Sequence, residues 1–161
     1  MDAINRQEFT ELITLRRIKP RYKRELRFVP EEITDWSQRD FIAVMNKSKS
    51  EGVLVVPFDT VRVVPFQLQR RKANASGRIG ATICDFCMTW QRGSNSAMIS
   101  FERSDKSSVS FLCCADLDCS LHVRNLTVAS KLSRTQLREN NSVEQRIDRL
   151  KTRLDALLST V

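Results

Sequence analysis

Five cysteines lie in one short segment, and their spacing is the feature of the sequence most able to support chemistry. Cys84 and Cys87 form a Cys-x-x-Cys motif, and the adjacent pair Cys113 and Cys114 is followed by Cys119. A Cys-x-x-Cys turn supplies two thiolates, and a second pair completes the tetrahedron that Zn²⁺ prefers. Five cysteines cannot all pair in disulfides, whereas four ligands and one spare thiol fit such a site. The cysteines therefore predict a bound Zn²⁺ ion.

The fourth ligand has to be chosen between two neighbouring cysteines. Because neighbouring side chains on a strand point to opposite faces, Cys113 and Cys114 should not both reach one metal ion. Cys114 would end the strand, where the backbone can turn towards Cys119, so we favour Cys114. We expect Cys113 to be a small buried apolar side chain. His122 is an alternative ligand, although a lone histidine is more often an ordinary helix residue.

The same segment argues against catalysis. A redox dithiol at the Cys-x-x-Cys motif would lack its usual βαβ context and would leave the second cysteine cluster unexplained. A catalytic zinc usually keeps three protein ligands and an open position. With one histidine and four glycines, the chain offers neither a Ser-His-Asp constellation nor a phosphate-binding loop. We expect a closed, structural zinc site and no enzyme activity.

A hairpin and a helix are expected to position the cysteines. Residues 97–103 and 109–114 indicate two strands, joined by a polar turn over residues 104–108. Asp116 and Asp118 then stand at the start of a helix, where the helix dipole favours acidic residues. A zinc knuckle, a hairpin and a helix that carries the last ligand together form a treble clef, which we place at residues 81–125.

A closing helix is predicted over residues 142–160. Ser142 and Gln145 form a capping-box pattern at its start. Its apolar side chains recur every three or four residues, which indicates an amphipathic helix. We assign Arg146 to the polar, solvent-facing side. The apolar stripe is short for a coiled coil, so we expect the helix to pack on its own domain and the protein to be monomeric.

The N-terminal part of the chain mixes helical and extended patterns. Residues 5–18 predict an amphipathic helix, and residues 31–45 indicate further helical material after a Pro-Glu-Glu start signal. Residues 52–58 and 60–68 are rich in β-branched side chains and predict a hairpin. Between the helical patterns, residues 16–27 contain seven Lys or Arg in twelve positions, and Pro20 suggests a connector with an extended piece.

These elements define the class and the organisation of the fold. We predict an α+β protein with a small antiparallel sheet, a treble-clef zinc finger, N-terminal helices and a C-terminal amphipathic helix. We divide it into an N-terminal helix and basic arm at residues 1–30 and a domain at residues 31–161. The chain has 161 residues, which is the size of one ordinary domain with an appended arm.

The composition of the chain indicates its cellular compartment and the kind of partner that it binds. The chain has 41% hydrophobic residues, enough for a core, and a formal net charge of +8, which favours anionic partners such as RNA, ribosomes or acidic protein faces. No apolar run is long enough for a membrane span, and the N-terminus lacks a signal-peptide pattern. We therefore expect a cytoplasmic protein without a membrane partner.

Several of these motifs together resemble a known family. The sequence from CDFCMTW through SFLCCADLDCSLHVRN to VEQRIDRLKTRLDALLSTV is similar to the C-terminal treble-clef zinc-finger domain of bacterial FusB-type proteins. The resemblance places the ligands at Cys84, Cys87, Cys114 and Cys119. It also implies a non-enzymatic protein that binds elongation factor G and helps to release it from the ribosome, for example when fusidic acid traps the factor there.

Two binding functions are consistent with the sequence. In the first, the protein docks on elongation factor G, on the ribosome or on both. In the alternative, the basic run at residues 16–27 and an aromatic side chain bind ribosomal or other RNA directly. Candidate contact residues lie around the Cys-x-x-Cys motif or in the basic loop, by which we mean residues 70–72 and the loop at 73–80 that they lead into. They are Arg70, Arg71, Lys72, Arg78, Phe86, Met88, Trp90 and Arg92. For Phe86 and Met88, packing in the core beneath the zinc module is an equal alternative.

Overall fold

The computed structural model describes residues 1–15, 18–103 and 107–161, and the chain forms two compact units, Met1–Leu68 and Gln69–Val161. Both units combine helices with antiparallel strands, so the predicted α+β class is confirmed. Within the described ranges, no helix has both the length and the apolar composition that crossing a membrane requires. The boundary near residue 30 remains a prediction.

Three antiparallel strands follow one another along the chain in the first unit, the third of them running two residues past its boundary. They are β1 (Ile42–Met45), β2 (Glu51–Pro57) and β3 (Val61–Arg70). In this register Val44 lies opposite Val53, and Val55 lies opposite Val63. The β-branched side chains suit a buried, pleated surface, and β2 is buried from its second to its sixth residue. The two strands predicted at 52–58 and 60–68 are thus confirmed.

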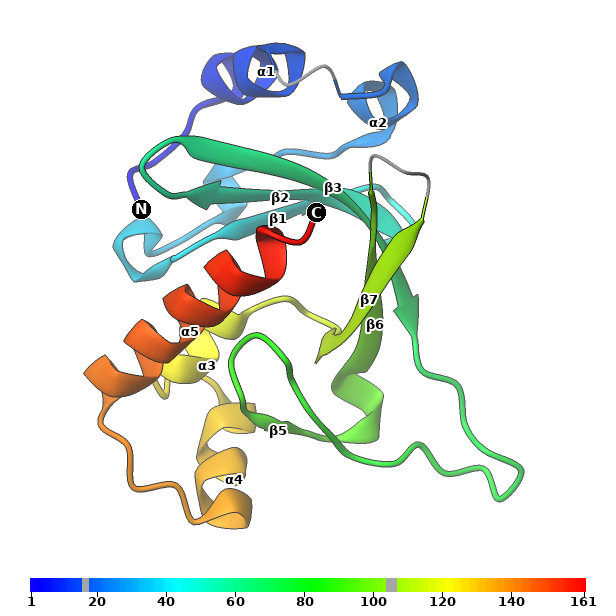
Figure 1. Cartoon of the computed structure of the whole chain (residues 1–161), viewed down its shortest axis with the longest axis vertical. Helices are drawn as coiled ribbons and strands as arrows, with labels where there is room; N and C mark the ends of the chain where they lie inside the picture. The colour runs from blue at the N-terminus through cyan, green and yellow to red at the C-terminus, as the bar shows by residue number, and fades with distance from the viewer. Residues whose placement is uncertain (16–17, 104–106) are drawn as a thin grey trace. The chain divides into compact units, whose positions relative to one another are not determined.

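Two helices cover the strands of the first unit, as Figure 1 shows: α1 (Arg6–Leu15) and α2 (Pro20–Glu25). Phe9 and Ile13 lie four residues apart on α1, so both face the same side and enter the core. Alternate residues of the strands meet them, because side chains two apart on a strand share a face. The strand residues of this core are Ile42, Val44, Val53, Val55 and Val63.

Two sequence predictions in this unit are wrong. Residues 31–45 are not helical beyond two short 3₁₀ turns, and the alternating apolar side chains at the end of this segment form β1 instead. The connector with an extended piece predicted within residues 16–27 is instead helical over Pro20–Glu25 (α2). Pro20 stands at the start of this helix, where the N–H that proline lacks would have no partner in the helix. Arg16 and Arg17 lie outside the described residues.

The described part of the second unit contains short strands and three α-helices. The elements in chain order are β4 (Thr82–Ile83), β5 (Trp90–Gln91), β6 (Ser96–Glu102), β7 (Ser108–Cys114), α3 (Cys119–Val123), α4 (Val128–Leu137) and α5 (Val143–Leu158). Strands β4 and β5 form one antiparallel pair, and β6 and β7 form another. The hairpin predicted at 97–103 and 109–114 is confirmed. Residues 104–106 of its predicted turn lie outside the described residues.

Helix α5 closes the second unit and packs against α3 (Figure 1). Its capping box is present: the Ser142 backbone N–H donates to Gln145 Oε1, and the Gln145 N–H donates to Ser142 Oγ. Leu150, Leu154 and Leu158 are buried at successive turns. The predicted amphipathic helix is therefore confirmed.

Candidate metal centre

The Cys-x-x-Cys motif forms the tight turn between β4 and β5. The Cys84 N–H donates to the Thr89 carbonyl at 3.0 Å, and the Met88 N–H donates to the Cys84 carbonyl at 2.9 Å. Met88 has a positive φ of 55°, which reverses the chain directly after Cys87. The turn therefore holds both thiols on one side of a small knuckle.

The second pair of thiols lies where β7 passes into α3. Cys114 is the last residue of β7, opposite Ser96, and Cys119 is the first residue of α3. Between them, Leu117 has a positive φ of 55° and its N–H donates to the Cys114 carbonyl at 3.1 Å. This turn brings the end of the strand and the start of the helix together.

The four Sγ atoms of Cys84, Cys87, Cys114 and Cys119 all lie within 4.8 Å of one another, and the four residues are buried. Neighbouring Sγ atoms are 3.6 to 3.8 Å apart. In a regular tetrahedron with Zn–S bonds of about 2.3 Å, neighbouring sulfur atoms lie about 3.8 Å apart. A disulfide would need about 2.05 Å, so the thiols are spaced for a metal ion.

The pKa shifts of these thiols show why a cation is needed for all four to be ionised at once. Burial alone raises the pKa of Cys87, but hydrogen bonds from the other three thiols and from His122 outweigh burial and lower it well below its ordinary value. Burial raises the pKa of Cys114, and the hydrogen bond with Cys114 raises that of Cys119. Four thiolates at this distance repel one another, and Zn²⁺ supplies the charge that lets all four ionise.

Cys113 lies outside this cluster. It is buried on β7 opposite Ala97, and its side chain points to the other face of the strand from that of Cys114. Burial, followed by the charges of Cys84 and Cys87, raises its pKa far above the ordinary value, so it stays a neutral thiol. The geometry thus agrees with our choice of Cys114, and the assignment of the four ligands is our proposal.

His122 approaches the cluster from α3. Its Nδ1 atom lies 3.3 Å from Cys114 Sγ, and its Nε2 atom lies 3.6 Å from Asp116 Oδ2. Burial by itself lowers the pKa of His122, but Asp116 and the Cys87 thiolate outweigh it and raise the pKa to about 10. A charged imidazole donates hydrogen bonds and cannot bind a metal. We therefore propose that His122 supports the sulfur of Cys114 and lies outside the ligand set.

A chain of polar side chains continues from the cluster, and the sequence analysis missed it. Thr89 Oγ1 lies 2.8 Å from Cys87 Sγ and accepts a hydrogen bond from Gln91 Nε2 at 2.7 Å. Asn95 Nδ2 donates to Gln91 Oε1 at 3.0 Å and to Asp116 Oδ2 at 2.7 Å. Side chains two residues apart on a strand share a face. Two polar residues at that spacing directly after the Cys-x-x-Cys motif are the sequence signal that could have predicted the roles of Thr89 and Gln91.

The helix that carries Cys119 is fixed by a buried arginine. Arg146 of α5 is 0% exposed, so its predicted place on the solvent-facing side is wrong. Its guanidinium donates to the His122 carbonyl at 3.0 Å and to Asn125 Oδ1, and it forms an ion pair with Glu139. The guanidinium thus joins α5 to the last turn of α3, where the His122 carbonyl also accepts from the Asn125 N–H at 3.2 Å.

The candidate contact residues near the knuckle differ in exposure. Phe86 is 0% exposed, so of its two alternatives core packing is confirmed and the contact role is wrong; its ring faces Phe111. Met88 and Trp90 are half-buried, and Arg92 is exposed.

The candidate contacts in the basic loop are all exposed: Arg70, Arg71, Lys72 and Arg78. Arg71 NH1 donates to the Gly80 carbonyl at 3.2 Å, which joins the two ends of this loop. Within it, Asn74 Oδ1 accepts from the N–H groups of Ser76 and Arg78. The loop thus presents its basic side chains from a turn that its own backbone hydrogen bonds define.

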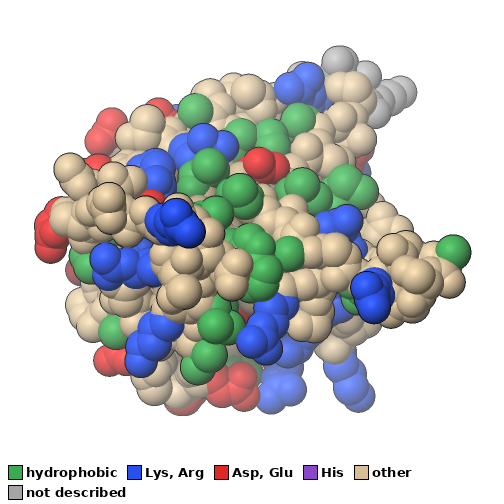
Figure 2. All heavy atoms as spheres, turned by 90° about the horizontal axis from the view of Figure 1, so that it is seen from below, with side chains coloured by type: hydrophobic (Ala, Val, Ile, Leu, Met, Phe, Trp, Pro, Cys, Tyr) green, Lys and Arg blue, Asp and Glu red, His purple; other side chains and the backbone are tan. Residues whose placement is uncertain are grey.

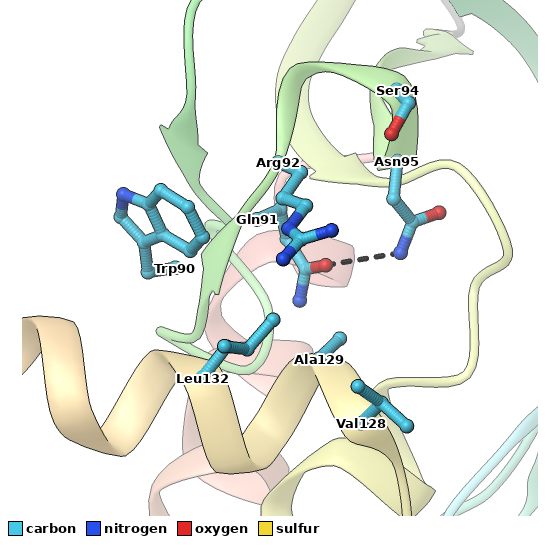
Figure 3. Close-up of a pocket in the computed structure, with 8 residues that line it drawn as sticks. All are labelled: Trp90, Gln91, Arg92, Ser94, Asn95, Val128, Ala129 and Leu132. Carbon is cyan, nitrogen blue, oxygen red and sulfur yellow. Dashed lines mark hydrogen bonds between the residues drawn. The ribbon is translucent and has the colours of Figure 1, made fainter.

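A pocket of about 120 Å³ opens between β5 and α4, next to the polar chain that leads to the metal centre (Figure 3). Two predicted contact residues, Trp90 and Arg92, line it. The remaining lining residues are Gln91, Ser94, Asn95, Val128, Ala129 and Leu132. The structure therefore brings these two predicted contacts to one surface feature.

Comparison with known proteins gives one result that bears on this centre. No curated protein and no solved structure matched the chain. A family model described as the FBP C-terminal treble-clef zinc-finger matches residues 21–161, which include every element of the metal centre. The fold, the four clustered thiols and this match together establish Zn²⁺ as the cofactor. The chain therefore belongs to the FusB-type C-terminal treble-clef zinc-finger family.

Proposed function

We propose that the protein is a non-enzymatic, cytoplasmic binding protein that docks on elongation factor G, on the ribosome or on both. Docking would favour release of the factor, in the manner of fusidic acid resistance. The observation that carries the proposal is the family match over residues 21–161, since this family is a zinc-finger binding type associated with translation factors.

The metal centre suits a binding role because it is closed. Four buried thiols satisfy the tetrahedral preference of Zn²⁺ and leave no open position for a substrate. Zinc then acts by holding the knuckle, the end of β7 and the start of α3 in one arrangement. The surface around the knuckle is thereby fixed before a partner arrives, which lowers the entropic cost of docking.

Basic side chains near this surface support an acidic partner. Arg70, Arg71, Lys72 and Arg78 are exposed on the loop that precedes the knuckle, and Arg92 is exposed directly after it. Positive charge on one surface speeds the encounter with a negatively charged partner and makes binding weaken with salt.

Isothermal titration calorimetry with purified elongation factor G, in the absence of ribosomes, tests this proposal. We expect a saturable complex at low salt that weakens as the salt concentration rises. The absence of any complex at low salt would contradict direct docking on the factor.

RNA binding is the alternative that this experiment separates. Its support is the basic run at residues 16–27, although Arg27 of that run already pairs with Glu32 at 3.1 Å. Replacement of Lys23 and Arg24 by Gln should leave factor binding unchanged. If the same substitutions instead abolish binding to ribosomal RNA while the factor never binds, the RNA alternative replaces our proposal.

A further inference from the structure

The pocket beside the zinc knuckle has the dimensions of a receptor for one side chain. Its volume is about 120 Å³, whereas pockets for drug-sized ligands measure roughly 300–1,000 Å³. Half-buried Trp90 lines one side of the pocket, and the first half of α4 lines another with Ala129 and Leu132 (Figure 3). A pocket of this size between an aromatic ring and aliphatic side chains fits a single aliphatic or aromatic group.

The rim of the pocket is unusually apolar for a surface. Val128, which lines the pocket, is 75% exposed, and the nearby Leu126 is 53% exposed. On the face that carries α4, Figure 2 shows hydrophobic side chains gathered beside Lys and Arg side chains. Apolar patches bordered by polar residues are typical of protein interaction sites.

Two basic side chains beside the pocket are available to an acidic partner. Arg92 lines the pocket, and Lys131 lies three residues after Val128, so that it shares that side of α4. Helix α4 contains no acidic residue. Among the described residues, no ion pair engages Arg92 or Lys131. Asp116, a carboxylate near the pocket, is already bonded to Asn95 and paired with His122.

The walls of the pocket are held by the metal centre. Gln91 and Asn95 line the pocket and belong to the polar chain that begins at Cys87 and Thr89. On the other side, the Trp90 N–H donates to Ser133 Oγ of α4 at 2.8 Å. Strand and helix are thus joined directly, and the pocket exists without a partner.

We infer that this pocket is the docking site for an acidic protein segment, which inserts one apolar side chain while its flanking carboxylates pair with Arg92 and Lys131. The aliphatic wall of Val128, Ala129 and Leu132 favours a peptide, since base stacking needs an open aromatic face and Trp90 is half-buried. The inference rests on the proposed function only in naming elongation factor G as the protein that carries the segment.

Variants at the rim test the inference with purified elongation factor G. Arg92→Glu reverses a lining charge, Val128→Glu places a charge at the apolar rim, and Ala129→Phe fills the pocket without changing charge. Each should weaken the complex by about tenfold or more, the effect of losing a central contact. Lys151→Glu, on the exposed side of α5, is the matched charge control and should stay within about twofold. Zinc content and thermal unfolding of every variant must match those of the wild type.

A peptide titration tests the pocket independently of the factor. In a Trp36→Phe background, Trp90 is the only tryptophan and reports on the pocket by its fluorescence. A short peptide with one Leu flanked by Glu should change the Trp90 emission saturably. Versions with Gln for Glu, or with Ser for Leu, should bind at least about tenfold more weakly, because charge pairing and apolar burial are each lost.

The two experiments separate the possible failures. If the acidic peptide binds as expected but the factor does not, the proposed function fails and the pocket inference stands. If the factor binds and the rim variants do not weaken the complex, the inference is wrong and the proposed function stands. Binding of an oligouridine that Arg92→Glu abolishes, with no binding of the acidic peptide, would also overturn the inference.

Discussion

The Nδ1 atom of His122 lies 3.3 Å from Cys114 Sγ, on the side of the ring opposite the Asp116 carboxylate. The imidazole therefore bridges a carboxylate at the surface of the site and a thiol in the cluster. Hydrogen bonds to a metal-binding sulfur lower its charge and fix its orientation, so groups that do not touch the metal still contribute to its affinity. This relationship assigns the only histidine of the chain a supporting role.

Replacement of His122 by Phe tests that role. The ring keeps a similar size, but the hydrogen bond to Cys114 and the pairing with Asp116 are lost. We expect zinc affinity to fall by about 10–100-fold while zinc still binds, since all four thiols remain. Competition with a chromophoric chelator measures the affinity. Complete loss of zinc would show instead that His122 is a ligand, and unchanged affinity would show that its hydrogen bond contributes nothing.

Loss of a thiol from either pair should be far more severe. Structural Zn²⁺ contributes roughly 10 kcal/mol or more to the folding of small zinc modules. We therefore expect Cys84→Ser and Cys119→Ser to lose zinc and to unfold the second unit. Metal analysis and urea unfolding followed by circular dichroism measure both effects. A variant that retains stoichiometric zinc and wild-type stability would contradict the four-thiol site.

The neighbouring cysteines on β7 provide a matched comparison. Both are buried, but only Cys114 points into the cluster. Cys114→Ser should lose zinc, whereas Cys113→Ser should retain it and lose only about 1–3 kcal/mol for a buried hydroxyl. Zinc content measured side by side decides between them. Equal zinc loss from the two variants would remove the basis for choosing Cys114.

The cysteine cluster could be predicted because its determinants are local. A Cys-x-x-Cys turn fixes two thiols within four residues, and strand alternation separates Cys113 from Cys114 without any knowledge of the fold. The capping box of α5 is local in the same sense, since Ser142 and Gln145 bond each other. Features set by neighbouring residues are thus readable from the sequence.

The features that sequence analysis missed depend on tertiary partners. Helix α4 carries its apolar Val128 towards solvent and buries Ser130 and Ser133, so the usual apolar stripe is absent. The sequence of residues 31–45 predicts helical material, but Ile42 and Val44 are paired with β2. Helical periodicity places Arg146 on the polar face, and only the folded protein shows the carbonyl of His122 beside it.

Arg146 leads to the last prediction, because a buried charge is costly unless its partners remain in place. Arg146→Met gives an unbranched apolar side chain but removes the hydrogen bonds to His122 and Asn125. It also removes one of the positive charges that pair with the buried carboxylate of Glu139. We expect a loss of about 3–5 kcal/mol in the free energy of unfolding, measured in urea. Lys151→Met, at an exposed position of the same helix, is the control and should change stability by less than about 0.5 kcal/mol. Equal stability of the two variants would show that Arg146 does not fix α3. The packing of the buried leucines Leu150, Leu154 and Leu158 would then be what holds α5 in place.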